Sequence, residues 1–137
     1  MKTLLAVLLC MGFVSAQAKP CSARDAEAAD QAVDSLTSWA AVDKNFRKYS
    51  HCDDGSIAEG NSDAIAHLLV DHWQTLDKLG ELTRSHPPLR NYVLRHIDST
   101  LDSNDLEKIQ NLTSRSCPST LKALCADLKS AAERASR

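Results

Sequence analysis

Residues 62–79 read SDAIAHLLVDHWQTLDKL, and this stretch decides the kind of fold that the chain forms. Its large apolar residues recur three or four positions apart, which is the period of an α-helix with one buried face. The positions on that face are Ile65, Leu68, Leu69, His72, Trp73, Leu76 and Leu79. The stretch therefore predicts an amphipathic helix, capped by Asn61 or Ser62 and ended near Ser85 by Pro87 and Pro88.

The same period recurs on both sides of this stretch. Further helices are expected over residues 22–48, with a bend near Thr37 and Ser38, over 89–101, from Ser103 to about 112, and from Pro118 to about 132. Residues 51–61 contain two glycines and three acids and predict a loop. No segment alternates between apolar and polar residues as a strand does. We therefore expect an all-α fold, a compact bundle of about five helices.

The first eighteen residues predict export from the cytoplasm. Lys2 precedes an apolar run from Leu4 to Val14, and Ala16-Gln17-Ala18 is the small-residue pattern after which signal peptidase cuts. The run is shorter than the roughly 20 residues that span a bilayer, so it predicts a cleaved signal peptide over residues 1–18 and no membrane span. Residues 19–137 are then a single helical domain, periplasmic or secreted.

Composition argues against several classes of partner. The formal charge of −2 becomes −3 once Lys2 is removed, because no acid lies in the leader. A mildly acidic chain lacks the basic face that binds nucleic acid or anionic lipid. Aromatic residues make up 4% of the chain, too few for a surface that stacks on bases. A protein or a small molecule is the expected partner.

Four cysteines remain after the leader and its Cys10 are removed, and in an exported domain they predict two disulfides. If residues 22–48 form one helix, Cys21 and Cys52 lie too far apart to be bridged, and the same holds for Cys117 and Cys125. Two schemes remain. They are Cys21 with Cys125 and Cys52 with Cys117, which we favour slightly, or Cys21 with Cys117 and Cys52 with Cys125.

No arrangement of residues predicts catalysis or a cofactor. The chain has no Gly-x-Ser-x-Gly motif and no glycine-rich phosphate loop, and its cysteines are expected to be oxidised. His67 and Asp71 are four positions apart but lack a third metal ligand, and His72, five positions from His67, is expected on another face. His72 and His96 fall on apolar stripes and are expected to be hydrogen-bonded core residues. The chain is therefore not expected to be an enzyme or to bind a metal.

The segment His51 to Gly60 is the best candidate for recognition of a partner. As an acidic loop anchored by Cys52 it would present Asp53, Asp54, Ser56 and Glu59 to a binding protein. The alternative is a solvated linker that Cys52 holds for stability alone.

The leader, the size, the paired cysteines and the runs CDDGSIAEG (52–60) and HIDSTLD (96–102) resemble those of small exported helical proteins of Gram-negative bacteria. This group includes immunity proteins of type VI secretion peptidoglycan amidases. The resemblance implies a periplasmic inhibitor that blocks a cell-wall amidase effector, and it allows a homodimer. A second hypothesis is a carrier of a lipid or metabolite, with a core widened around Trp73, Tyr92 and His96. A third is a structural or stress protein without a single partner.

Overall fold

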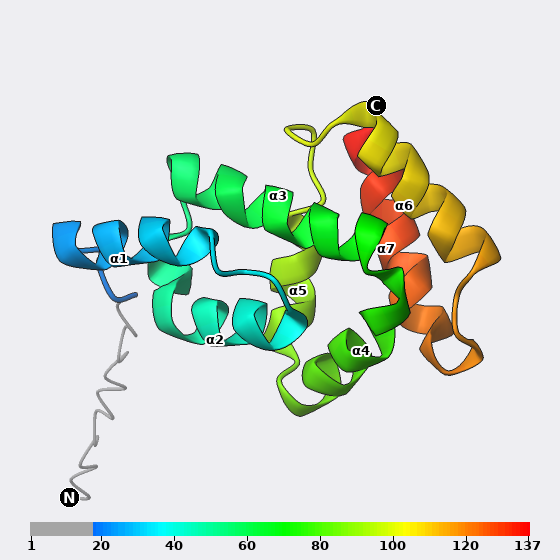
Figure 1. Cartoon of the computed structure of the whole chain (residues 1–137), viewed down its shortest axis with the longest axis horizontal. Helices are drawn as coiled ribbons and strands as arrows, with labels where there is room; N and C mark the ends of the chain where they lie inside the picture. The colour runs from blue at the N-terminus through cyan, green and yellow to red at the C-terminus, as the bar shows by residue number, and fades with distance from the viewer. Residues whose placement is uncertain (1–17) are drawn as a thin grey trace, which may run out of the picture.

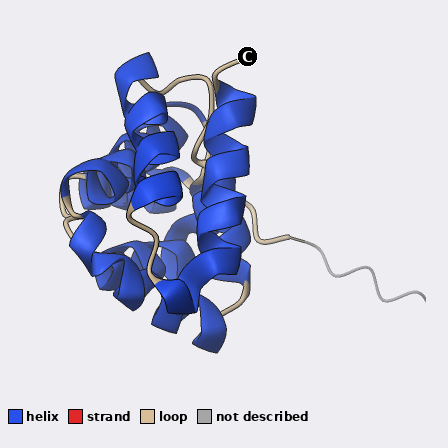
Figure 2. Cartoon of the chain, turned by 90° about the vertical axis from the view of Figure 1, so that its right-hand side faces the viewer, coloured by secondary structure: helices blue, strands red, loops and turns tan. Residues whose placement is uncertain are grey.

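Helices form nearly all of the regular structure in the computed structural model, which describes residues 18–137 (Figures 1 and 2). No strand occurs in this range, which confirms the all-α prediction, although there are seven α-helices rather than five. Residues 1–17 of the expected signal peptide lie outside it. The helices are α1 (Ala23–Val33), α2 (Trp39–Tyr49), α3 (Gly55–Asp71), α4 (Leu76–Ser85), α5 (Pro88–Arg95), α6 (Ser103–Arg115) and α7 (Lys122–Ala135).

The helix expected over residues 22–48 is two helices that run in opposite directions (Figure 1). Residues 34–38 reverse the chain, and Leu36 within them is buried. Ser38 then starts α2 as its N-cap, because its backbone is extended and its Oγ accepts a hydrogen bond from the N–H of Ala41 at 3.2 Å. The predicted bend near Ser38 is therefore a complete break.

The predicted loop at 51–61 is mostly helical. Asp54 is the N-cap of α3, and its Oδ1 accepts a hydrogen bond from the N–H of Gly55 at 2.8 Å. Gly55 has a φ of 53°, a conformation that residues with a side chain rarely adopt. α3 ends at Asp71, and a 3-10 turn at Trp73–Thr75 separates it from α4. The single helix expected over 62–85 is therefore two helices that begin at Gly55, earlier than expected, and end at Ser85, as expected.

The last three helices follow the prediction more closely. α5 ends at Arg95, six residues before the expected end, so residues 96–102 form a connection. α6 begins at Ser103 as expected, with Asp102 as its N-cap. A 3-10 turn at Ser119–Leu121 precedes α7, which therefore begins at Lys122 rather than at Pro118.

The two disulfides join Cys21 to Cys52, with Cα atoms 5.0 Å apart, and Cys117 to Cys125, 6.2 Å apart. This is the scheme that the sequence argument excluded, and both predicted schemes are wrong. The exclusion assumed an unbroken helix over 22–48, whereas the reversal at 34–38 returns Cys52 to Cys21. It also placed Cys125 two turns inside a helix, whereas α7 begins only three residues before it.

One hydrophobic core connects the helices, and α3 lies between the α1–α2 pair and the antiparallel α6–α7 pair (Figure 1). No helix in residues 18–137 is long and apolar enough to cross a bilayer. The largest fully buried side chains are Trp39, Tyr92, Ile65, Leu68, Leu69, Leu76, Leu79, Leu89, Ile109, Leu128, Val42 and Val93.

Candidate functional site

A pocket of about 220 Å³ lies where the first half of α3 meets the connection between α5 and α6. Hydrogen bonds of Asp53 and Ser62 with Arg95, His96 and Asp98 join the two segments. Polar side chains make up most of the lining, which consists of Asp53, Ala58, Glu59, Ser62, Arg95, His96, Asp98 and Thr100.

A chain of hydrogen bonds forms the floor of this pocket. Ser62 Oγ lies 2.8 Å from Nδ1 of His96, and Nε2 of His96 lies 3.0 Å from Oδ2 of Asp53. Ser62 Oγ also donates to Oδ2 of Asp98 at 3.2 Å. His96 is 3% exposed and Ser62 is 1% exposed. His96 is therefore a hydrogen-bonded core histidine, as predicted.

A carboxylate only accepts hydrogen bonds, so the Ser62 hydroxyl donates to Asp98 and Nε2 of His96 donates to Asp53. The contact between Ser62 Oγ and Nδ1 of His96 joins these two bonds into one buried line. The floor of the pocket therefore connects Asp53, before α3, to Asp98, in the connection between α5 and α6.

The carboxylate of Asp53 is the most heavily bonded group of the site. Its side chain is 4% exposed and, besides His96, it accepts from Nδ2 of Asn61 at 2.9 Å and from a terminal nitrogen of Arg95 at 2.6 Å. Burial raises the pKa of Asp53, but the hydrogen bonds from His96, Asn61 and Arg95 outweigh it and lower the pKa to about 2. Asp53 is therefore ionised and held inside the protein.

Asp98 shapes the opposite wall of the pocket. Its Oδ1 accepts from the backbone N–H and from the hydroxyl of Thr100, at 2.8 and 2.6 Å. Burial raises the pKa of Asp98, and the hydrogen bonds from Thr100 and Ser62 lower it below its ordinary value overall. These contacts fix the start of the connection between α5 and α6.

The four residues predicted to bind a partner occupy different environments. Asp54 caps α3 and is exposed, and Ser56 and Glu59 are exposed on the first turns of the same helix. Glu59 also lines the pocket. Asp53 points the other way, into the hydrogen-bonded floor, where Asn61, Arg95 and His96 hold its carboxylate.

α1 and α3 lie side by side and run in the same direction (Figure 1). They pack tightly at Gly60, where an added Cβ would lie 2.7 Å from Cγ1 of Val33. A side chain at position 60 would push the two helices apart. Because Gly60 has no side chain, α1 and α3 pack closely, and their exposed residues form one surface.

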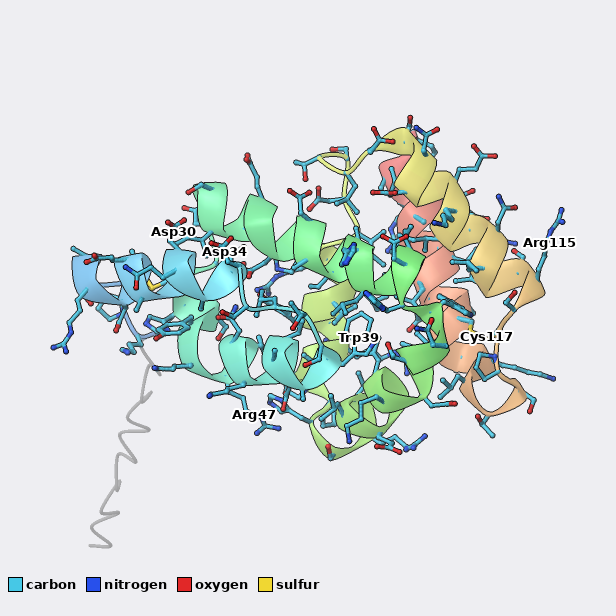
Figure 3. All side chains as sticks on the ribbon, viewed as in Figure 1. Asp30, Asp34, Trp39, Arg47, Arg115 and Cys117 are labelled. Atoms are coloured by element: carbon cyan, nitrogen blue, oxygen red, sulfur yellow. A yellow bond between two sulfur atoms is a disulfide. The ribbon has the colours of Figure 1, made fainter. Side chains whose placement is uncertain are left out.

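That surface carries four acids, which we call the acidic face: Asp30 on α1, Asp34 at its C-cap, and Glu59 and Asp63 on α3. Each pair is one turn apart, and helical spacing places both pairs on the same side of the contact between the helices. Asp30 and Asp34 lie between α1 and the first turns of α3 in Figure 3. All four are exposed, and none forms an ion pair with any residue in 18–137.

The remaining histidines do not form a metal site with their neighbours. His67 Nδ1 lies 2.9 Å from Oδ2 of Asp71, which also binds Lys108. The rings of His67 and His72 are in contact, with centroids 5.1 Å apart, so their placement on different faces was wrong. α3 ends at Asp71, and His72 turns back over the helix end. No three His, Cys, Asp or Glu side chains within residues 18–137 are arranged to hold a metal ion.

The residues proposed to widen the core for a ligand do not surround one cavity. Tyr92 and His96 pack edge to face, with ring centroids 4.5 Å apart, and both are buried. Trp73 lies beyond the other end of α3, where its Nε1 donates to the carbonyl of Ser116 at 2.9 Å.

Sequence reasoning missed Ser62, Asn61 and Arg95 as members of the site. Asn61 and Ser62 were interpreted as helix caps, although both are buried inside α3. A signal for Asn61 and Ser62 was present in the sequence, because these two polar residues stand next to the apolar face of one expected helix, and His96 is a polar residue on the apolar face of another.

Comparison with protein-family models, with curated proteins and with solved structures finds no match to the chain.

Proposed function

We propose that the protein is an exported, non-catalytic binding module that inhibits a protein partner through the acidic face. The observation that carries this proposal is the row formed by Asp30, Asp34, Glu59 and Asp63. All four carboxylates are exposed, and none forms an ion pair with a residue in 18–137. Unpaired charges of one sign attract a partner with the opposite charge and accelerate its association. A partner with a basic surface is therefore expected.

The scaffold behind the acidic face supports tight binding. The disulfide between Cys21 and Cys52 joins the start of α1 to the turn before α3, so both helices of the face are held at one end. The bonds among Asp53, Asn61 and His96 hold α3 from the other side. A surface that is already ordered loses little conformational entropy on binding.

The geometry of Ser62 supports a role without catalysis. Ser62, His96 and Asp53 are connected in the order of a nucleophilic triad. However, the Ser62 side chain is buried, and its hydroxyl contacts the carboxylate of Asp98 as well as the imidazole. Ser62 also lies in the interior of α3, where backbone N–H groups bond within the helix and leave no pair to stabilise an oxyanion. The hydrogen bonds among Ser62, His96 and Asp53 are better suited to holding the pocket rigid.

The resemblance noted above makes a peptidoglycan amidase effector of a type VI secretion system the first partner to test, with the periplasm as the compartment. An inhibitor that covers the substrate groove of such an enzyme needs an exposed, ordered surface. The acidic face, with Glu59 at the edge of the adjoining pocket, is the surface that we expect to do so.

The test captures the partner and measures how fast it associates. The oxidised protein is used as bait in periplasmic and secreted extracts, and any captured hydrolase is purified and assayed with and without the bait. A variant with Asp34→Asn and Glu59→Gln should associate about tenfold more slowly at low salt. The matched control is Asp77→Asn with Glu107→Gln, because both of these acids are exposed and unpaired elsewhere. Equal association rates for the two variants, or no captured protein, would contradict the proposal.

A further inference from the structure

Of the seven helices, α1 contributes least to the interior, and it lies at one end of the molecule (Figure 1). Its only buried residue is Ala29, and the cluster of buried apolar side chains that joins the other six helices contains no residue of α1. Leu36, which follows α1, does belong to this cluster. The chain is therefore anchored in the core from Leu36 onward, whereas α1 before it is not.

The sequence of α1 does not favour a helix that is stable by itself. Its eleven residues are fewer than the roughly 12 to 15 that a helix needs to persist in water without packing. Asp30 lies in the last turn and Asp34 is the C-cap, next to the negative end of the helix dipole, and no basic residue in the last turn offsets them. α1 therefore depends on the rest of the chain for its structure.

The start of α1 is held by a covalent bond and by polar contacts. Cys21 is bridged to Cys52, 31 positions further on, and Nε2 of His51 lies 3.0 Å from Oδ2 of Asp25. Further along the helix, the residues that pack inward are alanines and Val33. The disulfide is therefore the strongest single attachment of α1, because it limits how far the unpacked helix can move away.

The bridge can be reached from one side. Cys21 is exposed, whereas Cys52 is 3% exposed. A thiolate of a dithiol reductant can therefore attack Sγ of Cys21 and form a mixed disulfide, while Cys52 leaves as a thiolate and takes up a proton. The second thiol of the reductant then attacks the mixed disulfide. Both cysteines end as thiols, the dithiol becomes a disulfide, and two electrons pass to the protein.

We propose that the packing of α1 depends on the redox state of Cys21 and Cys52. While the two are bridged, α1 stays packed on α2 and α3. Reduction releases residues 18–34 from a bundle of six helices that stays folded, because the core from Leu36 onward does not include α1. Oxidation after export is then the step that docks α1.

This dependence would regulate the acidic face. Release of α1 carries Asp30 and Asp34 away from Glu59 and Asp63, so only the oxidised protein presents all four acids together. This consequence for binding rests on the proposed function, whereas the release of α1 does not.

The test measures backbone order by ¹⁵N NMR relaxation in the oxidised protein and in the variant Cys21→Ser with Cys52→Ala, where alanine avoids a buried hydroxyl. We expect the order parameters of residues 26–33 to fall from about 0.85 to below about 0.6 in the variant. Those of α7 should stay near about 0.85 in both proteins. Values near 0.85 for residues 26–33 in the variant would overturn the proposal. So would a loss of dispersed resonances from all helices, both in this variant and in Cys21→Ser alone, which keeps the buried Cys52.

The matched control is Cys117→Ala with Cys125→Ala, which removes the other bridge and should leave α1 ordered. This control keeps only the bridge between Cys21 and Cys52, so dithiothreitol should release α1 in it and reoxidation should restore the order. None of these measurements needs a partner. With a captured partner, the variant that lacks the first bridge should associate about tenfold more slowly. A released α1 with an unchanged association rate would contradict the role of the acidic face and support the redox dependence of α1.

Discussion

Nε2 of His96 lies 3.0 Å from Oδ2 of Asp53, and each side chain is 4% exposed. Asp53 directly follows the bridged Cys52, and His96 directly follows the last residue of α5. The pair therefore links the segment around Cys52, which is bridged to Cys21, to the connection between α5 and α6. Much of the order of the candidate site depends on this one contact.

Replacing Asp53 with Asn should destabilise the protein by about 2 to 3 kcal/mol. The amide keeps the volume but removes the charge that accepts from both His96 and Arg95, and an unpaired buried donor is costly. The measurement is urea unfolding of the oxidised protein. Asp54→Asn is the matched control, because Asn caps helices as well as Asp does and the position is exposed, so a change below about 0.5 kcal/mol is expected there. Equal losses in the two variants would show that the buried pair is not the cause.

Lowering the pH should destabilise the protein, because protonation removes the hydrogen bonds that its buried carboxylate accepts. The pKa of Asp53 is lowered from 3.8 to about 2 in the folded state, because hydrogen bonds from His96, Asn61 and Arg95 outweigh burial. Its unfolded form therefore binds a proton first as the pH falls. The stabilisation from Asp53 is fully present above about pH 4 and is lost as the pH falls toward 2. Unfolding free energies measured from pH 5 to 2 should fall, and the fall should be shallower in Asp53→Asn; identical slopes would contradict this.

The helical period predicted the fold class but not where the helices break. Apolar residues keep the 3.6-residue period across residues 34–38 and across His72, because the chain on both sides of each break faces the same core. What starts α2 is local: Ser38 adopts an extended backbone and caps the helix. The wrong disulfide schemes follow from that missed reversal and from the later start of α7, since the distance arguments assumed an unbroken helix over 22–48 and a helix from Pro118.

The candidate site was predictable only in part. The acids at 53, 54 and 59 were identified from charge, but the buried orientation of Asp53 depends on Arg95 and His96, which lie some forty residues away. Without the fold, no local signal distinguishes Asp53 from the exposed Asp54. Asp30 and Asp34 were not considered, because they join Glu59 only through the close packing of Val33 against Gly60.

The two disulfides should stabilise the protein unequally. Cys21 and Cys52 are 31 positions apart, whereas Cys117 and Cys125 are 8 apart. A longer closed loop restricts the unfolded chain more, so replacing the first pair by serines should cost about 3.5 kcal/mol and replacing the second about 2.5 kcal/mol. Urea unfolding gives the two losses, and peptide mapping of the unreduced protein checks the pairing. A larger loss from the second pair would indicate a contribution from the native state instead.

Gly60→Ala should destabilise the protein by about 1 kcal/mol, although Ala ordinarily favours a helix. The added Cβ would lie 2.7 Å from Cγ1 of Val33, which is too short for two carbon atoms, so the Val33 side chain or α1 itself must shift. Val33→Ala removes the colliding methyl groups. A double-mutant cycle should therefore show that Gly60→Ala is neutral or stabilising once Val33 is replaced. Additive effects of the two substitutions would mean that this contact does not set the spacing of α1 and α3.

Neutralising the acidic face should make the free protein more stable while it slows partner binding. Asp30, Asp34, Glu59 and Asp63 repel one another, and no basic residue in 18–137 forms an ion pair with them. The variant with Asp34→Asn and Glu59→Gln should gain a few tenths of a kcal/mol, roughly 0.3 to 0.5, in urea unfolding at low salt. The gain should shrink at about 0.5 M salt, because the Debye length is then much shorter than 10 Å. A variant that is less stable at low salt would show that these carboxylates hold the fold together, whereas a stabilised variant that binds more slowly identifies charges kept for recognition.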